Sequence, residues 1–433
     1  MNNKLRLGVG REIITPRLGT FLSGYSTSGR DATSVNDDLT ATVFCFEQGS
    51  LRAALVSLTL TLLDKEIADE LRSRIEGVCG IPREYIIVHS THTHSAPLTF
   101  TTKGWGTPNA EYVDNILIPR TVMAARTATE NLGEVSLSVS SANSFAGVNR
   151  RELGENSEII LGQWDAGPFD PAMTVLSFAD GEGKCVANLI HYGCHGTAAG
   201  NNLEISRDWP GVMTDSLERV SGGTTAFING TEGDVGPRLS NGKTTGKGDI
   251  RYAFEQGKIA AEDAVAIYGR AIYKDAELRC VEREIKIPVE RRISLEEAKE
   301  RLSGVNDPNP QHAERIRMFY EEIIRSYEEG YRERDFVSYR QTAIKIGDAA
   351  FVSSPFETFS EIGLRIKCHS DIPHVLCVSM ANGCESYLPT KKEIYRGGYE
   401  TKCFKTEHVQ PLIDDADSAF VEETLKTLDQ LKL

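Results

Sequence analysis

Residues 39–63 read LTATVFCFEQGSLRAALVSLTLTLL. Two apolar runs rich in β-branched residues flank a glycine–serine pair, which predicts two strands joined in a hairpin. Residues 64–77 follow with apolar side chains on one face, which predicts a helix with Asp64 as its N-cap. A further strand then leads into Val88. This β-α-β order predicts a mixed α/β fold whose chemistry gathers at the ends of strands.

The remainder of the chain continues this mixture of strands and helices. Strands are predicted at 135–141, 174–178, 186–191, 225–229, 338–346 and 349–353, and a long helix at 251–268. Residues 294–334 are charged and helical in pattern, with a break at Asp307-Pro308-Asn309-Pro310. Because strand-like segments resume directly afterwards, we interpret about 292–336 as a helical hairpin inserted into the domain. The sequence thus predicts one α/β domain over residues 1–433, with mixed β-sheets flanked by helices.

The composition is that of a soluble globular protein, with 40% hydrophobic and 25% charged residues. A net charge of −14 argues against nucleic acid or an anionic membrane as the main partner, because both select clustered lysine and arginine. We therefore expect a small-molecule substrate, and homo-oligomerisation stays open. No uncharged apolar run approaches the roughly 18 residues that suggest a membrane-spanning helix.

Two features predict a cytoplasmic location. The first residues, Met1 to Gly8, contain neither the apolar core nor the small-residue cleavage site of a signal peptide. The nine cysteines are odd in number and lack CxxC spacing, which is typical of reduced thiols. Cys194, which precedes His195, is the one cysteine that we consider as a ligand or nucleophile, although a small buried hydrophobic role is favoured.

The segment 88–97 reads VHSTHTHSAP and is the most informative for function. If the extended backbone continues past Val88, His92 and His94 lie on the same face, because side chains two apart share a face of a strand. Imidazole is the commonest protein ligand of zinc, so a same-face pair at a strand end predicts the start of a metal site. The alternative is a hydrogen-bonded polar turn.

Four further polar clusters follow predicted strands. His195 lies among small residues directly after a strand, a setting that suits a ligand. Asp208 either orients a metal-bound imidazole, acts as a base, or caps the helix that follows it. The glycine-dense turn 229–237 is able to aim backbone N–H groups at an anion. The last two clusters contain Glu357, and Glu385 with Tyr387. Five clusters at strand ends together favour one shared site.

Taken in chain order, seven short motifs resemble those of the neutral/alkaline ceramidase family. They are LGVGREIITP (7–16), THTHS (91–95), Asn149-Arg150, CHGT (194–197), GDVGP (233–237), PFE (355–357) and Ser386-Tyr387. The resemblance covers nearly the whole chain and implies the catalytic domain of that family, so we expect no C-terminal immunoglobulin-like domain. Those enzymes bind one zinc ion through two histidines, a glutamate and a tyrosine, and hydrolyse an N-acyl amide.

The resemblance implies a zinc site formed by His92, His195, Glu357 and Tyr387, with His94 beside it as a substrate-contacting or proton-transfer residue. Phe356 stands where the Pro-Gly-Glu turn of the family has glycine. A larger departure is Gly236, because the family has a serine at this position, in Gly-Asp-Val-Ser-Pro. A mechanism that depends on that serine is therefore excluded here.

These observations predict a zinc-dependent hydrolase that cleaves an amide or ester bond with metal-activated water. We expect a small polar or N-acylated substrate rather than ceramide. His94 and Asp208 are the predicted proton-transfer residues. The predicted substrate-binding residues are Arg150, Arg207, Asp234 and Gly236. A polar site with Arg150, Arg207, Asp208 and Trp209 also suits a sugar or a small acid, so a carbohydrate-active hydrolase or deacylase is one alternative. The other is a non-catalytic binding protein.

Overall fold

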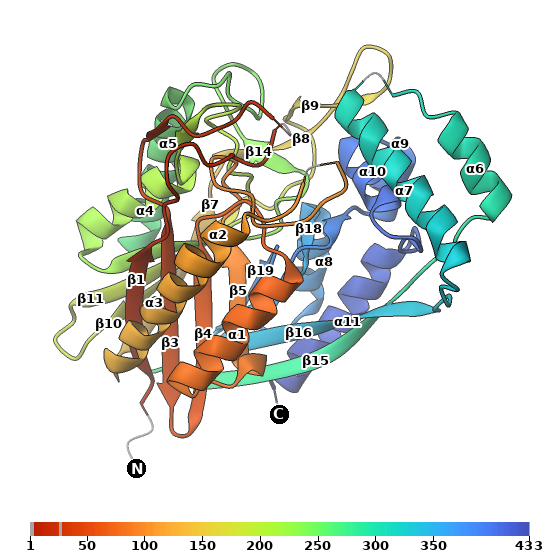
Figure 1. Ribbon diagram of the computed structural model, residues 1–433. Helices are drawn as coiled ribbons and strands as arrows, with labels where there is room; N and C mark the ends of the chain where they lie inside the picture. Colours follow the sequence, from red (N-terminus) through yellow and green to blue (C-terminus); the bar gives the residue numbers. More distant parts are fainter. Residues whose placement is uncertain (1–3, 26–27, 105, 308, 433) are drawn as a thin grey trace.

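The computed structural model of this protein describes residues 4–25, 28–104, 106–307 and 309–432. Met1 to Asn3, which enter the prediction that a signal peptide is absent, lie outside these ranges, as does Pro308 at the predicted break in the insertion. Three sheets of four or five strands, with helices packed against them, form the body of the molecule (Figure 1). The predicted mixed α/β fold is confirmed.

The first sheet has the strand order β5-β4-β3-β1-β6. Its strands are β1 (Arg6–Ile13), β3 (Thr40–Gln48), β4 (Leu51–Leu58), β5 (Ile86–Ser90) and β6 (Gly133–Glu134). β3 and β4 form the predicted antiparallel hairpin, and β4 connects through α1 (Lys65–Cys79) to β5, which runs parallel to it. The helix begins after Asp64 as predicted, but the Asp64 carboxylate accepts hydrogen bonds from Thr101 and makes no capping hydrogen bond.

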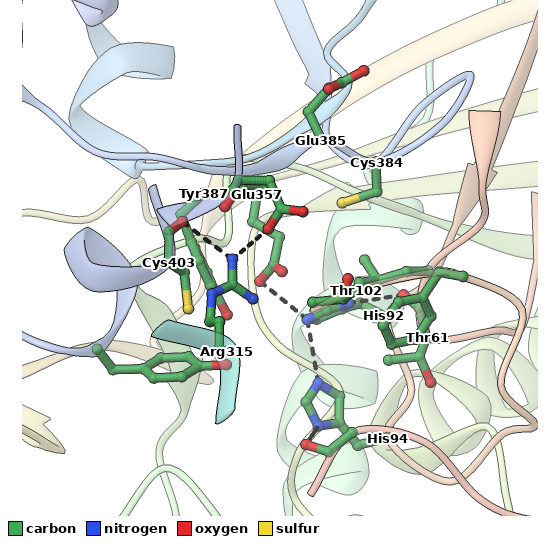
Figure 2. A pocket seen from close by; sticks show the side chains of 16 residues that line it. Thr61, His92, His94, Thr102, Arg315, Glu357, Cys384, Glu385, Tyr387 and Cys403 are labelled. Carbon is green, nitrogen blue, oxygen red and sulfur yellow. Dashed lines mark hydrogen bonds and ion pairs between the residues drawn. The ribbon is translucent and has the colours of Figure 1, made fainter. Parts of the chain in front are cut away.

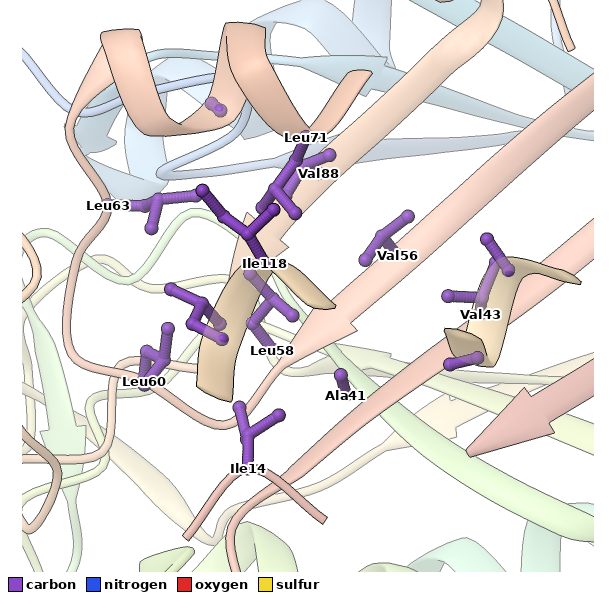
Figure 3. Close-up of a cluster of buried hydrophobic side chains, with 14 of the residues drawn as sticks. Ile14, Ala41, Val43, Val56, Leu58, Leu60, Leu63, Leu71, Val88 and Ile118 are labelled. Carbon is purple, nitrogen blue, oxygen red and sulfur yellow. The ribbon is translucent and has the colours of Figure 1, made fainter. Parts of the chain in front are cut away.

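Both faces of this sheet are covered, which explains why its strands are apolar at successive positions. In β3, Val43 and Cys45 belong to the core that lies against α1 and α3 (Ile118–Glu130), part of which is drawn in Figure 3. Phe44 and Phe46 belong to the core on the opposite face, which the other two sheets share. This alternation fixes the register, because a shift by one residue would exchange the two sets of side chains.

The second sheet has the order β13-β11-β10-β7, and the third has the order β15-β16-β17-β19. Their strands are β7 (Ser136–Asn143), β10 (Ala172–Ala179), β11 (Cys185–Tyr192), β13 (Thr224–Asn229), β15 (Leu278–Pro288), β16 (Phe336–Ile346), β17 (Ala349–Ser353) and β19 (His374–Val378). Helices α4 (Asp208–Ser221) and α5 (Arg251–Tyr268) cover the second sheet, and α8 (Ser360–His369) and α11 (Ala416–Gln430) cover the third. The strand segments predicted for these two sheets are therefore confirmed.

Short strands and helical segments connect the three sheets. They are β2 (Ser34–Val35), η1 (Arg83–Tyr85), α2 (Ala110–Tyr112), η2 (Val113–Leu117), β8 (Gly147–Leu153), β9 (Ile159–Trp164), β12 (Glu204–Ile205), β14 (Val235–Pro237), β18 (Phe356–Thr358), β20 (Ser386–Leu388), α9 (Lys391–Arg396) and α10 (Tyr399–Thr406).

Within the described ranges, no helix combines the length and the apolar character that crossing a bilayer requires.

The inserted helices are α6 (Leu295–Ser303) and α7 (Pro310–Glu328), which leave the third sheet between β15 and β16 (Figure 1). These two strands pair in antiparallel register up to Pro288 and Phe336, so the insertion extends from the end of a strand hairpin. α7 lies against α10, beside the cavity described below. The assignment of the whole chain to a single domain stays a prediction.

Each of the three sheets ends in one parallel pair at an edge, namely β4–β5, β11–β13 and β17–β19. The loops that follow parallel strands converge at their carboxyl ends, which is where α/β folds build their sites. His92 follows β5, His195 follows β11, and Glu357 follows β17. The topology therefore places one candidate ligand after a parallel strand of each sheet.

Candidate metal centre

His92 lies just beyond the end of β5, in a left-handed backbone conformation with φ of 69°. The extended backbone does not continue to this residue, so the premise of the same-face prediction is wrong. The two imidazoles nevertheless meet, with Nε2 of His92 3.3 Å from Nε2 of His94. Nδ1 of His92 donates to the Thr61 carbonyl at 2.8 Å, which leaves its Nε2 lone pair free.

His195 approaches the same point from the loop after β11. Its Nδ1 lies 2.9 Å and 3.0 Å from the carbonyl oxygens of Glu232 and Val235, so this nitrogen carries the proton and Nε2 is again free. The two histidine loops touch at Gly196, whose carbonyl accepts from the His94 N–H at 3.0 Å. A Cβ at Gly196 would lie 2.6 Å from the His92 carbonyl oxygen, so glycine is required for this close approach.

Glu357 completes the group from β18, which pairs in parallel with β20 so that Glu357 lies opposite Tyr387. Its Oε2 is 3.4 Å from Nε2 of His92 and 3.2 Å from Nε2 of His195. One ligand atom from each of the three residues falls within 4.8 Å of the others, and all three residues are buried. The structure thus brings together three of the four residues that the resemblance implies as metal ligands.

The chemistry of this donor set fits a metal ion. Both imidazoles present unprotonated nitrogens and Glu357 presents a carboxylate oxygen, so three electron-pair donors face one another. In the described residues, Nε2 of His195 and Oε2 of Glu357 are fully buried and make no hydrogen bond. Buried acceptors that converge without a donor need a cation between them, and two histidines with a carboxylate are a donor set that suits zinc.

Burial favours the neutral form of His195, which is the protonation state that binds metal. Together with the nearby Arg150 and His92, it lowers the pKa of His195 to about 3. Burial also holds the pKa of His94 well below its ordinary range, with His92 and His195 acting in the same sense. His94 is fixed by its Nδ1, which lies 3.1 Å from the Gly24 carbonyl.

Tyr387 lines the cavity beside Glu357, but its hydroxyl accepts a hydrogen bond from Nη2 of Arg150 at 3.2 Å. Arg150 also pairs with Glu400 at 2.9 Å, and its guanidinium lies 5.6 Å from the centre of the Tyr387 ring. This buried arginine therefore orients Tyr387, and it is not among the residues that line the cavity. Metal ligation by Tyr387 and substrate binding by Arg150 stay predictions.

Arg207 and Asp208 are engaged elsewhere. Arg207 forms ion pairs with Asp37 at 2.8 Å and Asp215 at 2.7 Å, and its predicted role in substrate binding stays a prediction. The Asp208 carboxylate accepts hydrogen bonds from the backbone N–H groups of Ala198, Ala199 and Trp209. These contacts anchor the loop that carries His195, and helix α4 begins without a side-chain capping hydrogen bond, so the alternative roles of Asp208 stay predictions.

Residues of the glycine-dense turn 229–237 also make structural contacts and do not line the cavity. The Asp234 carboxylate accepts from the Ser360 N–H at 2.7 Å and from Asn149 at 3.1 Å, and burial raises its pKa to about 7. Gly236 pairs with Val148 in a β-ladder, and a Cβ at this glycine would lie 2.5 Å from Cβ of Thr244. Thr244 thus fills the space beside the missing hydroxyl, and neither Asp234 nor Gly236 lines the cavity.

His92, His94 and Glu357 line a cavity with a volume of about 60 Å³ (Figure 2). Sequence reasoning missed several of its wall residues, all from the C-terminal third of the chain: Arg315 on α7, Tyr399 and Cys403 on α10, and Glu407. It also missed the buried Glu232, whose pKa is raised well above its ordinary range by burial and by nearby Glu357. None of these residues lies in a local motif, so only their positions in the fold reveal them.

Comparison with known proteins assigns this chain to a family. The model of the family "Neutral/alkaline non-lysosomal ceramidase, N-terminal" matches residues 5–286. The neutral ceramidase of Pseudomonas aeruginosa is 25% identical over 253 residues, a match that covers 54% of this chain and only 37% of that protein. The chain matches little more than a third of that relative in sequence.

Two solved structures share the fold over the full length of this chain. The crystal structure of neutral ceramidase from Pseudomonas aeruginosa superposes with a TM-score of 0.77 at 21% identity and is covered to 75% of its length. A ceramidase complexed with C2 superposes with a TM-score of 0.75 at 19% identity and is covered to 76%. Because the family model matches more than half of the chain, this protein belongs to the neutral/alkaline non-lysosomal ceramidase family.

Proposed function

We propose that this protein is a zinc-dependent hydrolase that cleaves an amide or ester bond in a small polar or N-acylated substrate rather than in ceramide. The observation that carries the proposal is the convergence of two imidazole nitrogens and one carboxylate oxygen, all buried, within 4.8 Å of one another. Membership of the ceramidase family supports hydrolysis as the type of reaction. His92, His195 and Glu357 would hold the ion, with Tyr387 as the fourth candidate ligand.

Zinc in such a site polarises a carbonyl oxygen and lowers the pKa of coordinated water to about 7. The chain supplies the rest. His94 is neutral and has its Nδ1 fixed on the Gly24 carbonyl, so its Nε2 is free to accept a proton and to return it to the leaving group. Burial of the three ligands excludes bulk water from the reacting centre.

The size of the cavity supports a small substrate. A volume of about 60 Å³ beside the candidate ligands favours a small group next to the metal. The wall also carries charged side chains, since Arg315, Glu385 and Glu407 take part in it. With Thr244 packed beside Gly236, no serine hydroxyl enters the proposed reaction.

The contacts of Arg207 and Trp209 weigh against the carbohydrate alternative. That alternative relied on a polar site with Arg150, Arg207, Asp208 and Trp209, of which Arg207 is paired with two aspartates and Trp209 is a buried core residue. The indole N–H of Trp209 donates to the His195 carbonyl at 2.8 Å. A non-catalytic binding protein is the remaining alternative, and metal content tests it directly.

We also propose a reducing compartment, the cytoplasm, as the location of this protein. All nine cysteines lie within the described residues, and each is a free thiol. Most of them are buried, and burial raises the pKa of the Cys45 and Cys403 thiols to about 11, which keeps them unreactive.

Metal analysis tests the proposed function. Purified wild-type protein is expected to bind one zinc ion per chain, and a strong chelator is expected to abolish hydrolysis of a short N-acyl substrate. His195→Ala should lose the bound zinc, because removing one of three protein ligands weakens a site of this kind by orders of magnitude. His369→Ala is the matched control, since this exposed histidine lies on the outer helix α8. Stoichiometric zinc in His195→Ala would refute the ligand assignment.

A further inference from the structure

The inserted helix α7 contributes one charged side chain to the wall of the cavity. Arg315 is only 6% exposed and lines the same cavity as His92 and Glu357 (Figure 2). Its Nε donates to the Thr406 hydroxyl at 3.0 Å. Its Nη2 donates to the Cys403 carbonyl at 3.2 Å and also to the Glu407 carboxylate.

The third nitrogen of this guanidinium, Nη1, makes no hydrogen bond to the described residues. Among the residues that the structure describes, Nη1 of Arg315 has no hydrogen-bond partner, whereas Nε and Nη2 are both bound. Nη1 is not one of the fully buried atoms without a partner, so an acceptor on a bound molecule can reach it. Arg315 lines the cavity, and the cavity is the place from which that acceptor can come.

Helix α7, which carries Arg315, is fixed by contacts with neighbouring segments. The His312 ring of α7 stacks on Tyr399 of α10, with ring centres 5.5 Å apart. Lys103 pairs with Glu322 of α7 at 3.0 Å. Because these contacts fix the donor in advance, binding a substrate through it requires little additional ordering.

The charges around the cavity favour an anionic ligand. Of the three lining carboxylates, Glu407 faces Arg315 and Glu385 faces the imidazole of His408 at 3.2 Å. The third, Glu357, belongs to the metal centre, where a divalent ion outweighs its single negative charge. A metal-loaded cavity therefore retains unmatched positive charge.

We propose that Nη1 of Arg315 binds a carboxylate oxygen of the substrate, which makes small N-acyl amino acids the preferred substrates of this protein. Arginine forms strong charge-assisted hydrogen bonds with carboxylates, and here one nitrogen is available for one oxygen. The scissile amide lies toward the metal centre and the carboxylate toward α7. This inference rests on the proposed function, of which it names the substrate class.

Paired substrates test the inference. N-acetylglycine and its uncharged analogue N-acetylglycinamide differ at the carboxylate, and zinc-loaded wild type is expected to prefer the acid at least about 10-fold in kcat/KM, mainly through KM. Arg315→Gln should remove this preference, whereas Arg317→Gln, an exposed residue on the same helix, should retain it. An unchanged preference in Arg315→Gln, or equal cleavage of both substrates by wild type, overturns the inference about Arg315. Either result leaves the proposed hydrolase function supported.

Binding to zinc-loaded protein with the His94→Ala change, which should retain the metal but not turn the substrate over, separates the inference from the proposed function. Calorimetry with the same two compounds is expected to show tighter binding of the acid to His94→Ala and equal binding of both to His94→Ala/Arg315→Gln. If zinc-loaded wild type cleaves neither compound but this difference in binding is present, the proposed hydrolase function is wrong and carboxylate binding by Arg315 is supported. If Arg315→Gln does not fold, the double variant Arg315→Gln/Glu407→Gln replaces it, and a retained preference there also overturns the inference.

Discussion

His92 holds its imidazole in place by adopting a backbone conformation that histidine rarely takes. A positive φ outside glycine is uncommon and concentrates at functional sites, where the surrounding structure holds the strained residue. Here the Thr61 carbonyl and the contact at Gly196 supply that support. The left-handed turn is what redirects the chain after β5, so that His92 and His94 meet without sharing the face of a strand.

His94 is expected to act in turnover and not in metal binding. His94→Ala should retain zinc, because the three residues that converge on the ion do not include it. Its kcat is expected to fall about 10²- to 10⁴-fold, the usual contribution of a general acid–base. Metal content and steady-state rates measured on the same preparation check this. Loss of zinc in His94→Ala would show instead that His94 is a ligand.

The His408–Glu385 pair at the mouth of the cavity predicts a pH-dependent contribution to stability. Burial lowers the pKa of His408, but the hydrogen bond and charge of Glu385 outweigh it and raise the pKa above 6.5. A histidine whose pKa is raised by folding stabilises the protein below pH 6.5 and loses this effect as the pH rises through the folded-state pKa. Because both side chains are partly exposed, the contribution is expected to stay below about 1 kcal/mol.

Urea unfolding of wild type and His408→Gln at pH 5.5 and pH 8.5 measures this contribution. Wild type should be the more stable at the lower pH, and the difference should vanish at the higher one. His369→Gln is the control, because its ring contacts only the Arg365 carbonyl in the described structure. A constant difference at both pH values would contradict the assignment.

At the scale of elements, strand pairing decides which side chains become neighbours. β18 and β20 are each only three residues long, yet their parallel register sets Glu357 opposite Tyr387 across 30 residues of sequence. The same holds for the insertion, which leaves the third sheet between β15 and β16 (Figure 1). Its helix α7 carries Arg315, which lines the cavity. A helix that reads from its sequence as a charged surface element therefore forms part of the candidate site.

Replacing residues 292–333 by a short Asn-Gly turn tests the independence of the insertion. β15 and β16 stay in register to Pro288 and Phe336, so a tight turn is expected to close them. The shortened protein should fold and bind one zinc ion, because His92, His195 and Glu357 all lie outside the insertion. It should lose the selectivity that Arg315 provides. Circular dichroism and metal analysis provide the measurement, and failure to bind zinc would contradict the prediction.

At the scale of the whole molecule, three sheets share one core and each supplies one ligand. Side chains from β3, β11 and β17 meet in the same hydrophobic cluster, which holds the sheets at fixed positions. The candidate metal centre lies where the loops of all three sheets converge, so a bound ion would connect parts of the chain that are far apart in sequence. Metal binding and global stability are therefore expected to be linked.

Zinc is expected to raise the unfolding temperature of wild type, because a ligand that binds only the folded state stabilises it by about 4 kcal/mol at a thousandfold excess over Kd. Differential scanning calorimetry with zinc and with a chelator measures the shift. A single transition is expected for a single domain, with no shift in His195→Ala and an unchanged shift in His369→Ala. Equal unfolding temperatures of wild type with and without zinc would argue against a preformed site.

The sequence by itself determined the local elements and the chemical identity of the site. Apolar periodicity is a property of neighbouring residues, so the hairpin β3–β4, the helix α1 and the long helix α5 could be predicted from it. The candidate ligands could be named because His92, His195 and Glu357 each follow a predicted strand within a recognisable motif.

Only the tertiary structure decided which polar groups are free to act. Arg207, Asp208 and Asp234 look equally available in sequence, but each is occupied by partners that folding brings to it. Conversely, Arg315 and Glu407 are 92 residues apart and meet at the cavity. Hydrogen bonds and ion pairs depend on distances of a few ångströms, which sequence patterns do not encode and packing of the three sheets sets.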